Sequence, residues 1–292
     1  MLYTIENEYM TVTVSDHGAE LQSILGRDGT EYLWQGDSAY WSDRAPNIFP
    51  YVARLTQGSY YLDGQLHKMR IHGIALYRPF RCLFNDGTRL VMELQSDGDT
   101  WQEYPRQFSF QIIYTLRQNT LEITFRVENQ DERPMYFGMG GHPGFRVPLE
   151  EGLTFEDYQL RFHAPCRPIR VGFTEDCFLN GQDTAYPLVQ DRYLPLRHDL
   201  FDEDAIVLKD MDRTVTLEAA NGSRAITVSF PTMGYLGIWH MPRTDAPYVC
   251  IEPWSSLPST KDRITVLEEQ PDLLSLEPGK AMESTWSVQI HR

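Results

Sequence analysis

Residues 108–127 read FSFQIIYTLRQNTLEITFRV, and this stretch indicates the fold class of the whole chain. Apolar and polar side chains alternate from Phe108 to Leu116 and again from Leu121 to Val127. A period of two is typical of a β-strand with one buried face. Gln118-Asn119, between the two runs, has the residue types of a tight turn. The stretch therefore predicts an antiparallel hairpin.

The same arrangement recurs along the chain, with short β-branched and aromatic runs on either side of a turn. Asp-Gly and Asn-Gly between alternating runs are the strongest short-range hairpin signal in a sequence. With the first hairpin, at least five such pairs are present. The further turns are Asp28-Gly29, Asp63-Gly64, Asn85-Asp86-Gly87 and Asn221-Gly222.

Helical periodicity is poor throughout. The best candidates for short helices are Glu103 to Phe108 and Asp199 to Phe201, while Ile264 to Leu267 is typical of a loop or a single turn. No change of composition divides the chain, and no period of about 20–50 residues repeats, which argues against a propeller. We therefore expect one all-β domain over residues 1–292, a large antiparallel β-sandwich. Ser284 to Ile290 should add an ordinary strand to one sheet.

Composition limits the classes of partner. The chain has 292 residues, of which 41% are hydrophobic, and a formal net charge of −15. An acidic protein repels phosphate backbones, so we expect no nucleic-acid partner, whereas a neutral ligand such as a sugar is compatible with the charge. The composition leaves a monomer and a homodimer equally open.

The amino terminus, MLYTIENEY, has neither the basic segment nor the apolar segment of a secretory signal. No apolar run approaches the roughly 18 residues that a membrane helix needs, so we expect no membrane partner. The four cysteines are widely spaced and include no CxxC pair. Reduced thiols and a cytoplasmic location are therefore expected.

The segment GMGGHPGF, residues 138–145, surrounds His142 with glycines and places Pro143 after it. Glycine permits positive φ and close approach of other groups, and proline biases the preceding residue toward extended backbone. His142 should thus lie at or just past a strand end, where it could present an imidazole to a cleft. The alternative is a tight turn in which the histidine only caps a backbone group.

The segment YVCIEPW, residues 248–254, places a glutamate directly after an apolar run that should be a central strand. Pro253 is expected to stop that strand, which would put Glu252 at its carboxyl end beside Trp254. Burial there would raise the pKa of the carboxyl group. Because carboxylates are rarely buried without a partner, a functional role is favoured over a structural one.

Three further segments carry candidate residues. Arg54 lies in the apolar run NIFPYVARL, and as a buried charge it could equally form a structural ion pair. His72 precedes a glycine in MRIHG, a setting in which a structural histidine is the more common case. Asp204 is the acidic residue nearest the apolar run in DEDAIVL, where ordinary turn residues are the alternative.

No serine elbow, phosphate-binding loop or dinucleotide fingerprint is present. His72, His142 and Glu252 could in principle share a metal ion, but nothing in their spacing supports this. We therefore expect neither a metal nor another cofactor.

Taken together, these segments resemble the galactose mutarotase-like superfamily of aldose 1-epimerases, in particular its lactose-operon-associated bacterial branch. The matching segments occur in family order and are PYVARL, IHG, GGHPGF, LFDEDAIVL and VCIEPW. The resemblance implies a large antiparallel β-sandwich with a sugar bound in an open cleft. It also implies Glu252 as general base, His142 as general acid, and Arg54, His72 and Asp204 as substrate-binding residues.

The implied reaction opens a cyclic hemiacetal and closes it from the other face. A carboxylate takes the proton of the C1 hydroxyl and an imidazolium protonates the ring oxygen, which we expect to require the two groups on opposite sides of the anomeric centre. His142 and Glu252 should therefore share one cleft, which Arg54 and His72 also line. Trp34 or Trp254 could stack on the sugar.

Two alternatives to a free-sugar epimerase remain. Relatives that act on hexose 6-phosphates tend to carry HGFAR, whereas this chain reads HGIAL, with Leu76 in the arginine's place and Arg78 two positions on. Arg44 does match an arginine of that branch. The other alternative is a sugar-binding protein without catalytic activity, since a fold does not determine function.

Overall fold

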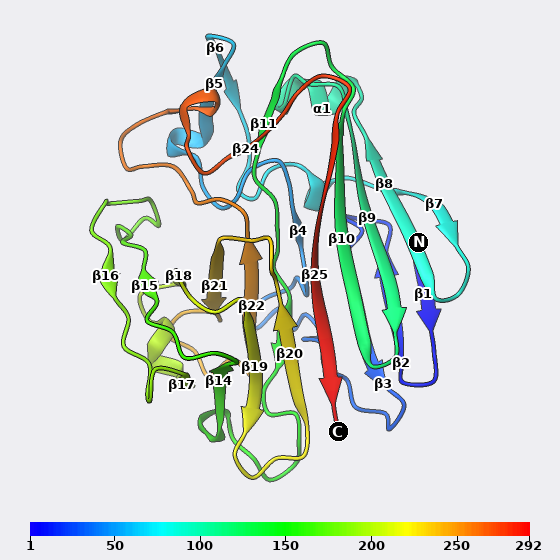
Figure 1. Cartoon of the computed structure of the whole chain (residues 1–292), viewed down its shortest axis with the longest axis vertical. Helices are drawn as coiled ribbons and strands as arrows, with labels where there is room; N and C mark the ends of the chain where they lie inside the picture. Colours follow the sequence, from blue (N-terminus) through cyan, green and yellow to red (C-terminus); the bar gives the residue numbers. More distant parts are fainter.

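The computed structural model describes residues 1–292, and two large antiparallel sheets make up most of it (Figure 1). The larger sheet has nine strands in the order β17-β14-β19-β20-β25-β10-β9-β8-β7. Its strands are β7 (Arg81–Asn85), β8 (Arg89–Gln95), β9 (Phe108–Arg117), β10 (Thr120–Asn129), β14 (Tyr158–Phe162), β17 (Tyr193–Pro195), β19 (Thr214–Ala219), β20 (Ala225–Ser229) and β25 (Ala281–His291).

The second sheet has eight strands, seven of them in the order β16-β15-β18-β21-β22-β12-β4, and β13 also pairs with β22. Its strands are β4 (Asn47–Ile48), β12 (Gly140–Gly141), β13 (Gly144–Arg146), β15 (Ile169–Arg170), β16 (Thr184–Ala185), β18 (Ile206–Lys209), β21 (Tyr235–Trp239) and β22 (Tyr248–Trp254). Most of these strands are short, and the strand next to β22 is divided into β12 and β13.

Three smaller sheets lie beside the two large ones, in the orders β1-β2-β3, β23-β5-β6 and β11-β24. Their strands are β1 (Leu2–Glu6), β2 (Met10–Ser15), β3 (Leu21–Gly26), β5 (Ser59–Leu62), β6 (Gln65–Lys68), β11 (Met135–Phe137), β23 (Thr265–Val266) and β24 (Leu274–Leu276).

The main core consists of side chains from the facing surfaces of the two large sheets. A single cluster of 65 buried residues contains Ile112 and Phe125 from the nine-stranded sheet together with Ile238 and Ile251 from the eight-stranded sheet. Each fully buried aliphatic or aromatic side chain contributes about 1.5–3 kcal/mol. This layered arrangement confirms the predicted antiparallel β-sandwich.

The hairpin predicted from residues 108–127 is β9–β10, in which Leu121 lies opposite Leu116. Three other predicted turns also join neighbouring strands, namely β5–β6, β7–β8 and β19–β20. The turn at Asp28-Gly29 is followed by a single bridge between Leu25 and Glu31 rather than by a full strand.

The helix predicted at Glu103 to Phe108 is wrong, because helix α1 spans Gly98–Glu103 and strand β9 begins at Phe108. Asp97 starts the helix early by accepting the backbone N–H groups of Asp99 and Thr100. Pro105 biases Tyr104 toward extended backbone, so the helix ends there.

The remaining helical segments are single 3₁₀ turns, η1 (Thr56–Gly58), η2 (Ala75–Tyr77), η3 (Phe155–Asp157), η4 (His198–Phe201) and η5 (Leu267–Glu269). The short helix expected at Asp199 to Phe201 lies within η4. None of the helices has the length and apolar character needed to cross a membrane.

Strand β25 occupies the middle of the nine-stranded sheet. It is 11 residues long and pairs with β20 on one side and β10 on the other. The predicted C-terminal strand is therefore present, and it joins the two halves of the nine-stranded sheet (Figure 1).

Candidate active site

Strand β22 is buried on both faces, and its two faces have different neighbours. Val249 and Ile251 belong to the main core. Successive side chains in a strand point to opposite faces. Glu252 and Trp254 therefore project from the other face, where they line a pocket. The alternation that buries half of this strand in the core thus presents the glutamate to a ligand site.

Pro253 does not stop the strand as predicted, because β22 continues to Trp254. The backbone N–H groups along this edge of the strand show why the proline fits. Ile251 donates to the Pro143 carbonyl and Ser255 donates to the Met139 carbonyl, while Pro253 between them has no N–H to donate. The missing hydrogen bond coincides with the break between β12 and β13, so Glu252 lies inside a strand rather than at its end.

His142 occupies that break. Its backbone N–H donates to the Pro46 carbonyl at 3.0 Å. The flanking glycines serve close packing, since Gly140 and Gly141 do not have positive φ angles. A Cβ on Gly141 would lie 2.5 Å from the Trp286 ring, and one on Gly140 would lie 2.7 Å from the Pro253 carbonyl oxygen. Larger residues would displace the strand that carries His142.

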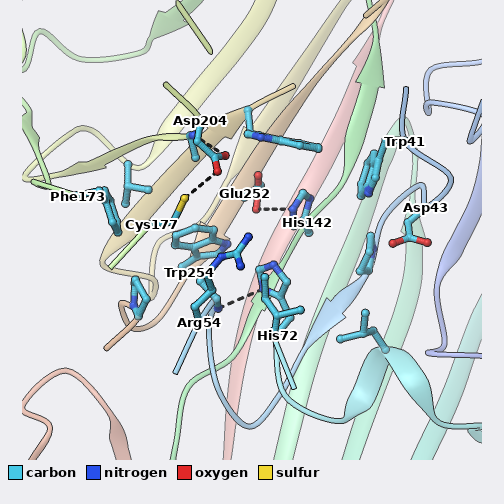
Figure 2. A pocket seen from close by; sticks show the side chains of 18 of the residues that line it. Trp41, Asp43, Arg54, His72, His142, Phe173, Cys177, Asp204, Glu252 and Trp254 are labelled. Atoms are coloured by element: carbon cyan, nitrogen blue, oxygen red, sulfur yellow. Dashed lines mark hydrogen bonds and ion pairs between the residues drawn. The ribbon is translucent and has the colours of Figure 1, made fainter. Parts of the chain in front are cut away.

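His142 and Glu252 contact each other directly, with Nε2 3.2 Å from Oε2 (Figure 2). Their side chains are only 12% and 1% exposed. The contact lacks hydrogen-bond geometry, and both His142 Nδ1 and Glu252 Oε2 are buried without a hydrogen-bond partner. A sugar cannot fit between the two side chains. The expectation that they stand on opposite sides of the anomeric centre is therefore wrong, and a substrate must approach both from one side.

Burial favours the uncharged form of both groups. It lowers the pKa of His142 to about 4, against weaker opposing effects of a backbone hydrogen bond and of the Asp204 carboxylate. Burial also raises the pKa of Glu252 well above its usual range, and the negative charge of Asp204 adds to that shift. Both directions favour the form of the pair in which Glu252 carries the proton and His142 is neutral.

Two tryptophans fix the position of the His142 ring. The ring of Trp41 lies 5.0 Å from it at a 33° angle, and Trp239 meets it edge-on at 5.7 Å. Sequence reasoning selected Trp34 and Trp254 instead. Trp254 does line the pocket, whereas Trp34 is buried against Tyr248 with ring centroids 4.7 Å apart.

His72 is held by an exchange of hydrogen bonds with Ala53. The His72 backbone N–H donates to the Ala53 carbonyl at 2.9 Å, and the Ala53 N–H donates to His72 Nδ1 at 3.2 Å. Burial lowers the pKa of His72 well below its usual range, with His142 and Arg54 adding to the effect. A neutral ring whose Nδ1 accepts must carry its proton on Nε2, so His72 can donate a hydrogen bond to a ligand.

The glycine after His72 is required by the backbone. Gly73 has a φ of +81°, and a Cβ there would lie 2.3 Å from the Phe49 carbonyl oxygen. His72 itself has a φ of 62°, which is uncommon for a residue with a side chain. The IHG segment is therefore a strained turn that directs one imidazole into the pocket.

Arg54 differs from its prediction. It is exposed rather than buried, and it lines the same pocket. Its backbone carbonyl accepts from Ser259, while its guanidinium has no hydrogen bond or ion pair with any residue of the chain. The alternative of a structural ion pair is therefore wrong, and five N–H donors remain available to a ligand.

Asp204 lines the same pocket, as Figure 2 shows. Its φ of 78° is in the left-handed region. One carboxylate oxygen accepts the Ala205 N–H at 2.9 Å, and the other accepts the thiol of Cys177 at 2.8 Å. Cys177 was not predicted, because nothing in its local sequence indicates that the fold places it beside Asp204.

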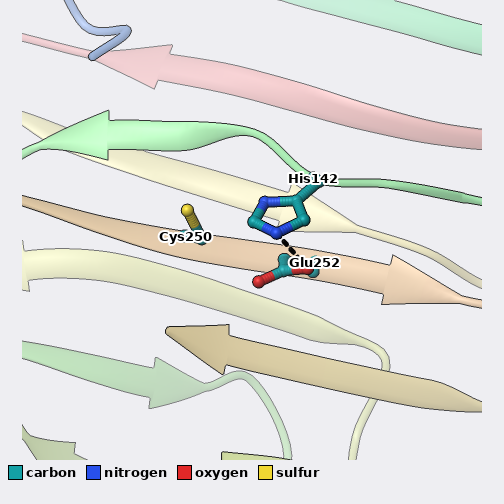
Figure 3. Close-up of side chains that lie close together, drawn as sticks. All are labelled: His142, Cys250 and Glu252. Atoms are coloured by element: carbon teal, nitrogen blue, oxygen red, sulfur yellow. Dashed lines mark ion pairs between the residues drawn. The ribbon is translucent and has the colours of Figure 1, made fainter. Parts of the chain in front are cut away.

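Cys250 lies close to His142 and Glu252, as Figure 3 shows. The ligand atoms of the three residues lie within 4.8 Å of one another. Burial raises the pKa of the Cys250 thiol well above its usual range, and the neighbouring Glu252 adds to the shift. Because a cysteine binds metal as the thiolate, the chemistry of this set does not favour a metal ion. The set considered from the sequence was His72, His142 and Glu252. In that set Nδ1 of His72 already accepts the Ala53 N–H, so it is not available to a metal ion.

One pocket thus contains all five residues predicted from the sequence to bind or react, which are Arg54, His72, His142, Asp204 and Glu252. They come from strand β22, from the β12–β13 break and from loops before η1, η2 and β18. The family model for aldose 1-epimerase matches residues 1–288. The chain belongs to the aldose 1-epimerase family.

Relatives within the family include the plasmid-encoded protein LacX of Lactococcus lactis subsp. lactis, 29% identical over 99% of each chain. Among solved structures, a galactose mutarotase related enzyme from Lactobacillus acidophilus is 32% identical, with a TM-score of 0.94, covering 100% of this chain and 98% of the other. A galactose mutarotase-like protein from Lactobacillus casei is 28% identical, with a TM-score of 0.93 and full coverage of both chains. The resemblance inferred from the sequence, including its lactose-operon-associated branch, is confirmed.

Proposed function

We propose that this family member is an active aldose 1-epimerase that interconverts the α and β anomers of a free aldohexose. The observation that carries the proposal is the direct contact of 3.2 Å between His142 Nε2 and Glu252 Oε2 in a pocket with unpaired polar groups. A general acid and a general base at this distance can serve two oxygens bonded to the same carbon. The C1 hydroxyl and the ring oxygen of an aldose are such a pair.

In the proposed reaction, Glu252 removes the proton of the C1 hydroxyl while His142 protonates the ring oxygen. The C1–O5 bond breaks, a C1 carbonyl forms, and the open-chain sugar rotates about C1–C2. Ring closure from the other face reverses both proton transfers and restores the enzyme. Proton transfer of this kind contributes about 10²–10⁴-fold in rate. Every proton taken up is returned within the cycle, so the proposed reaction requires no cofactor.

The reactive arrangement has the pair's single proton on His142. In this arrangement both groups are charged, and burial disfavours charged groups. The Asp204 carboxylate, in contrast, favours a protonated His142. Asp204 therefore has an electrostatic role in addition to binding hydroxyls.

Sugar hydroxyls both donate and accept hydrogen bonds, and the pocket offers partners of each kind. Arg54 and the Nε2–H of His72 are donors, while Asp204 retains acceptor capacity on both oxygens. The partner of this site is accordingly a small-molecule sugar.

The positive groups of the structure support a free sugar over a hexose 6-phosphate. Arg44 donates to the Gln22 carbonyl, and Arg78 pairs with Glu103 at 2.7 Å, so neither guanidinium is available in the pocket. Leu76 lines the wall where the phosphate branch has an arginine. Arg54 is the only lysine or arginine among the lining residues, whose carboxylates are Asp43, Glu203, Asp204 and Glu252.

A binding protein without catalytic activity is less well supported. A binder requires neither an acid nor a base, and a buried carboxyl group with an unpartnered oxygen costs stability. Retention of such a costly pair favours a catalytic role.

The test is anomer exchange measured by polarimetry or NMR on a panel of free and phosphorylated aldohexoses. The proposal predicts acceleration above the buffer rate for at least one free sugar and little or none for the 6-phosphates. Exchange of the phosphates alone would establish the sugar-phosphate alternative. Sugar binding without exchange would establish the binding protein.

A further inference from the structure

Asp204 is held without a cationic partner. No lysine, arginine or histidine forms an ion pair with it. One oxygen accepts the Ala205 backbone N–H at 2.9 Å, and the Cys177 thiol is the only side chain that donates to the other, at 2.8 Å. A carboxylate with one donor on each oxygen has a fixed plane and keeps free lone pairs on both oxygens.

The loop that carries Cys177 is well anchored. Phe173 pairs with Leu179, and the Cys177 N–H donates to the Thr174 carbonyl at 2.9 Å. Cys177 itself has a φ of 65°, so the backbone adopts an uncommon conformation at the residue that faces Asp204. Lys261 forms an ion pair with Asp176 in the same loop.

Backbone hydrogen bonds connect this loop to Arg54. The Leu179 N–H donates to the Ser259 carbonyl, and the Ser259 N–H donates to the Arg54 carbonyl, each at 3.0 Å. Cys177 and Arg54 thus lie on segments joined by hydrogen bonds, and both line the pocket that contains Glu252 (Figure 2).

We propose that Cys177 is a positioning residue for sugar binding, whose thiol holds the Asp204 carboxylate in the orientation that accepts sugar hydroxyls. The inference rests on the proposed function only in taking Asp204 as a sugar ligand. Cys177 need not touch the sugar and takes no part in the proton transfers. Burial and the Asp204 hydrogen bond raise the pKa of Cys177 to about 12, so the thiol remains a donor at neutral pH.

The experiment measures dissociation constants for D-glucose and D-galactose by calorimetric titration, together with kcat and KM for anomer exchange. Cys177→Ala removes the donor and should weaken binding about tenfold, the size of a hydrogen bond to a charged group. Its kcat should stay within about twofold. Cys177→Ser retains an O–H donor and should bind within about threefold of wild type. Cys82→Ala is the matched control, because Cys82 is a half-buried thiol on β7 outside the pocket, and it should change nothing.

A double-mutant cycle separates positioning from a general structural role. If the thiol acts through Asp204, Cys177→Ala should cause no further loss of binding in an Asp204→Ala background. Equal losses in Cys177→Ser and Cys177→Ala, or full additivity with Asp204→Ala, would overturn the proposal. So would unchanged sugar affinity in Cys177→Ala.

Infrared spectroscopy provides a readout that does not need the alanine variant to fold. The S–H stretch of Cys177 is identified as the band that disappears in Cys177→Ser. In Asp204→Asn this band should shift to higher frequency, because the amide is a weaker acceptor than the carboxylate. An unchanged frequency would contradict the hydrogen bond. Because dissociation constants are measured separately from exchange, a wild-type protein that binds sugar without exchanging anomers would refute the epimerase function and leave the role of Cys177 testable.

Discussion

The hairpin β9–β10 and the strand β22 are both buried, yet they are constructed differently. In β9–β10, core and outward-facing side chains alternate over 10 residues on each strand, and the ladder with β25 is regular. Strand β22 contains a proline, adjoins a broken neighbour, and carries a carboxyl group with an unpartnered oxygen. Regular pairing provides stability in one region, while the irregular region forms the site.

This difference implies that stability and activity can be separated by mutation. Eight buried side-chain polar atoms have no hydrogen-bond partner, and three of them, Glu252 Oε2, His142 Nδ1 and Trp254 Nε1, line the pocket, whereas only Trp286 Nε1 lies on a strand of the nine-stranded sheet. Such atoms lower stability unless a ligand satisfies them. Substitutions in the nine-stranded sheet should therefore lower stability without lowering the rate of anomer exchange. Substitutions in the pocket should lower the rate without lowering stability.

The largest expected effect is on the rate. His142→Asn should lower kcat about 10²–10⁴-fold with little change in KM, because the side chain loses its acid but keeps its size. The double variant His142→Asn with Glu252→Gln should be no slower than about the worse single variant, since the two residues act as a unit. Rapid-quench or NMR kinetics would measure both, and multiplicative losses would show that the residues act independently.

A substitution in the nine-stranded sheet should lower stability and leave the rate nearly unchanged. Leu121→Ala in β10 removes a fully buried side chain that does not line the pocket and should cost about 2–5 kcal/mol of unfolding free energy. At a temperature where the variant remains folded, kcat should stay within about twofold. Denaturant unfolding and anomer exchange on the same preparation provide the measurement. A tenfold slower folded variant would contradict the separation.

A smaller effect is expected at the binding wall. His72→Asn removes the Nε2–H donor and should raise KM about tenfold with kcat nearly unchanged, the size of one hydrogen bond. His67→Asn is the matched control, because His67 is a half-buried histidine on β6 outside the pocket. A fall in kcat with constant KM would instead place His72 in the chemical step.

The smallest effect is a gain of stability. The raised pKa keeps Glu252 protonated in the folded chain at pH values where the unfolded chain has released the proton, so this group makes stability fall as pH rises above about 4.5. Glu252→Gln removes that cost and should raise Tm, by about 2–4 °C for each kcal/mol. The gain should be larger at pH 8 than at pH 5. Scanning calorimetry at both values tests this, and a loss of Tm at pH 8 would show that the charged pair stabilises the fold.

The fold could be predicted from sequence because strand alternation and turn residues are local signals. Glu252 and His142 were found because each breaks a local pattern, as a carboxylate in an apolar run and a histidine among glycines. Trp41, Trp239 and Cys177 were not found, since their importance comes from contacts between distant segments. The continuation of β22 through Pro253 also depends on the neighbouring strand. That strand is broken at His142, so it leaves no carbonyl there for a backbone N–H at position 253 to pair with.

The central claim is that the paired His142 and Glu252 exchange anomers of a free aldose. Saturation-transfer NMR on the anomeric protons, run with wild type and Glu252→Gln beside a binding titration with the same sugar, tests it most directly. We predict exchange well above the buffer rate for wild type, and near-normal binding with exchange reduced about 10²–10⁴-fold for Glu252→Gln. Wild-type binding without exchange, or a Glu252→Gln variant that retains most of the rate, would contradict it.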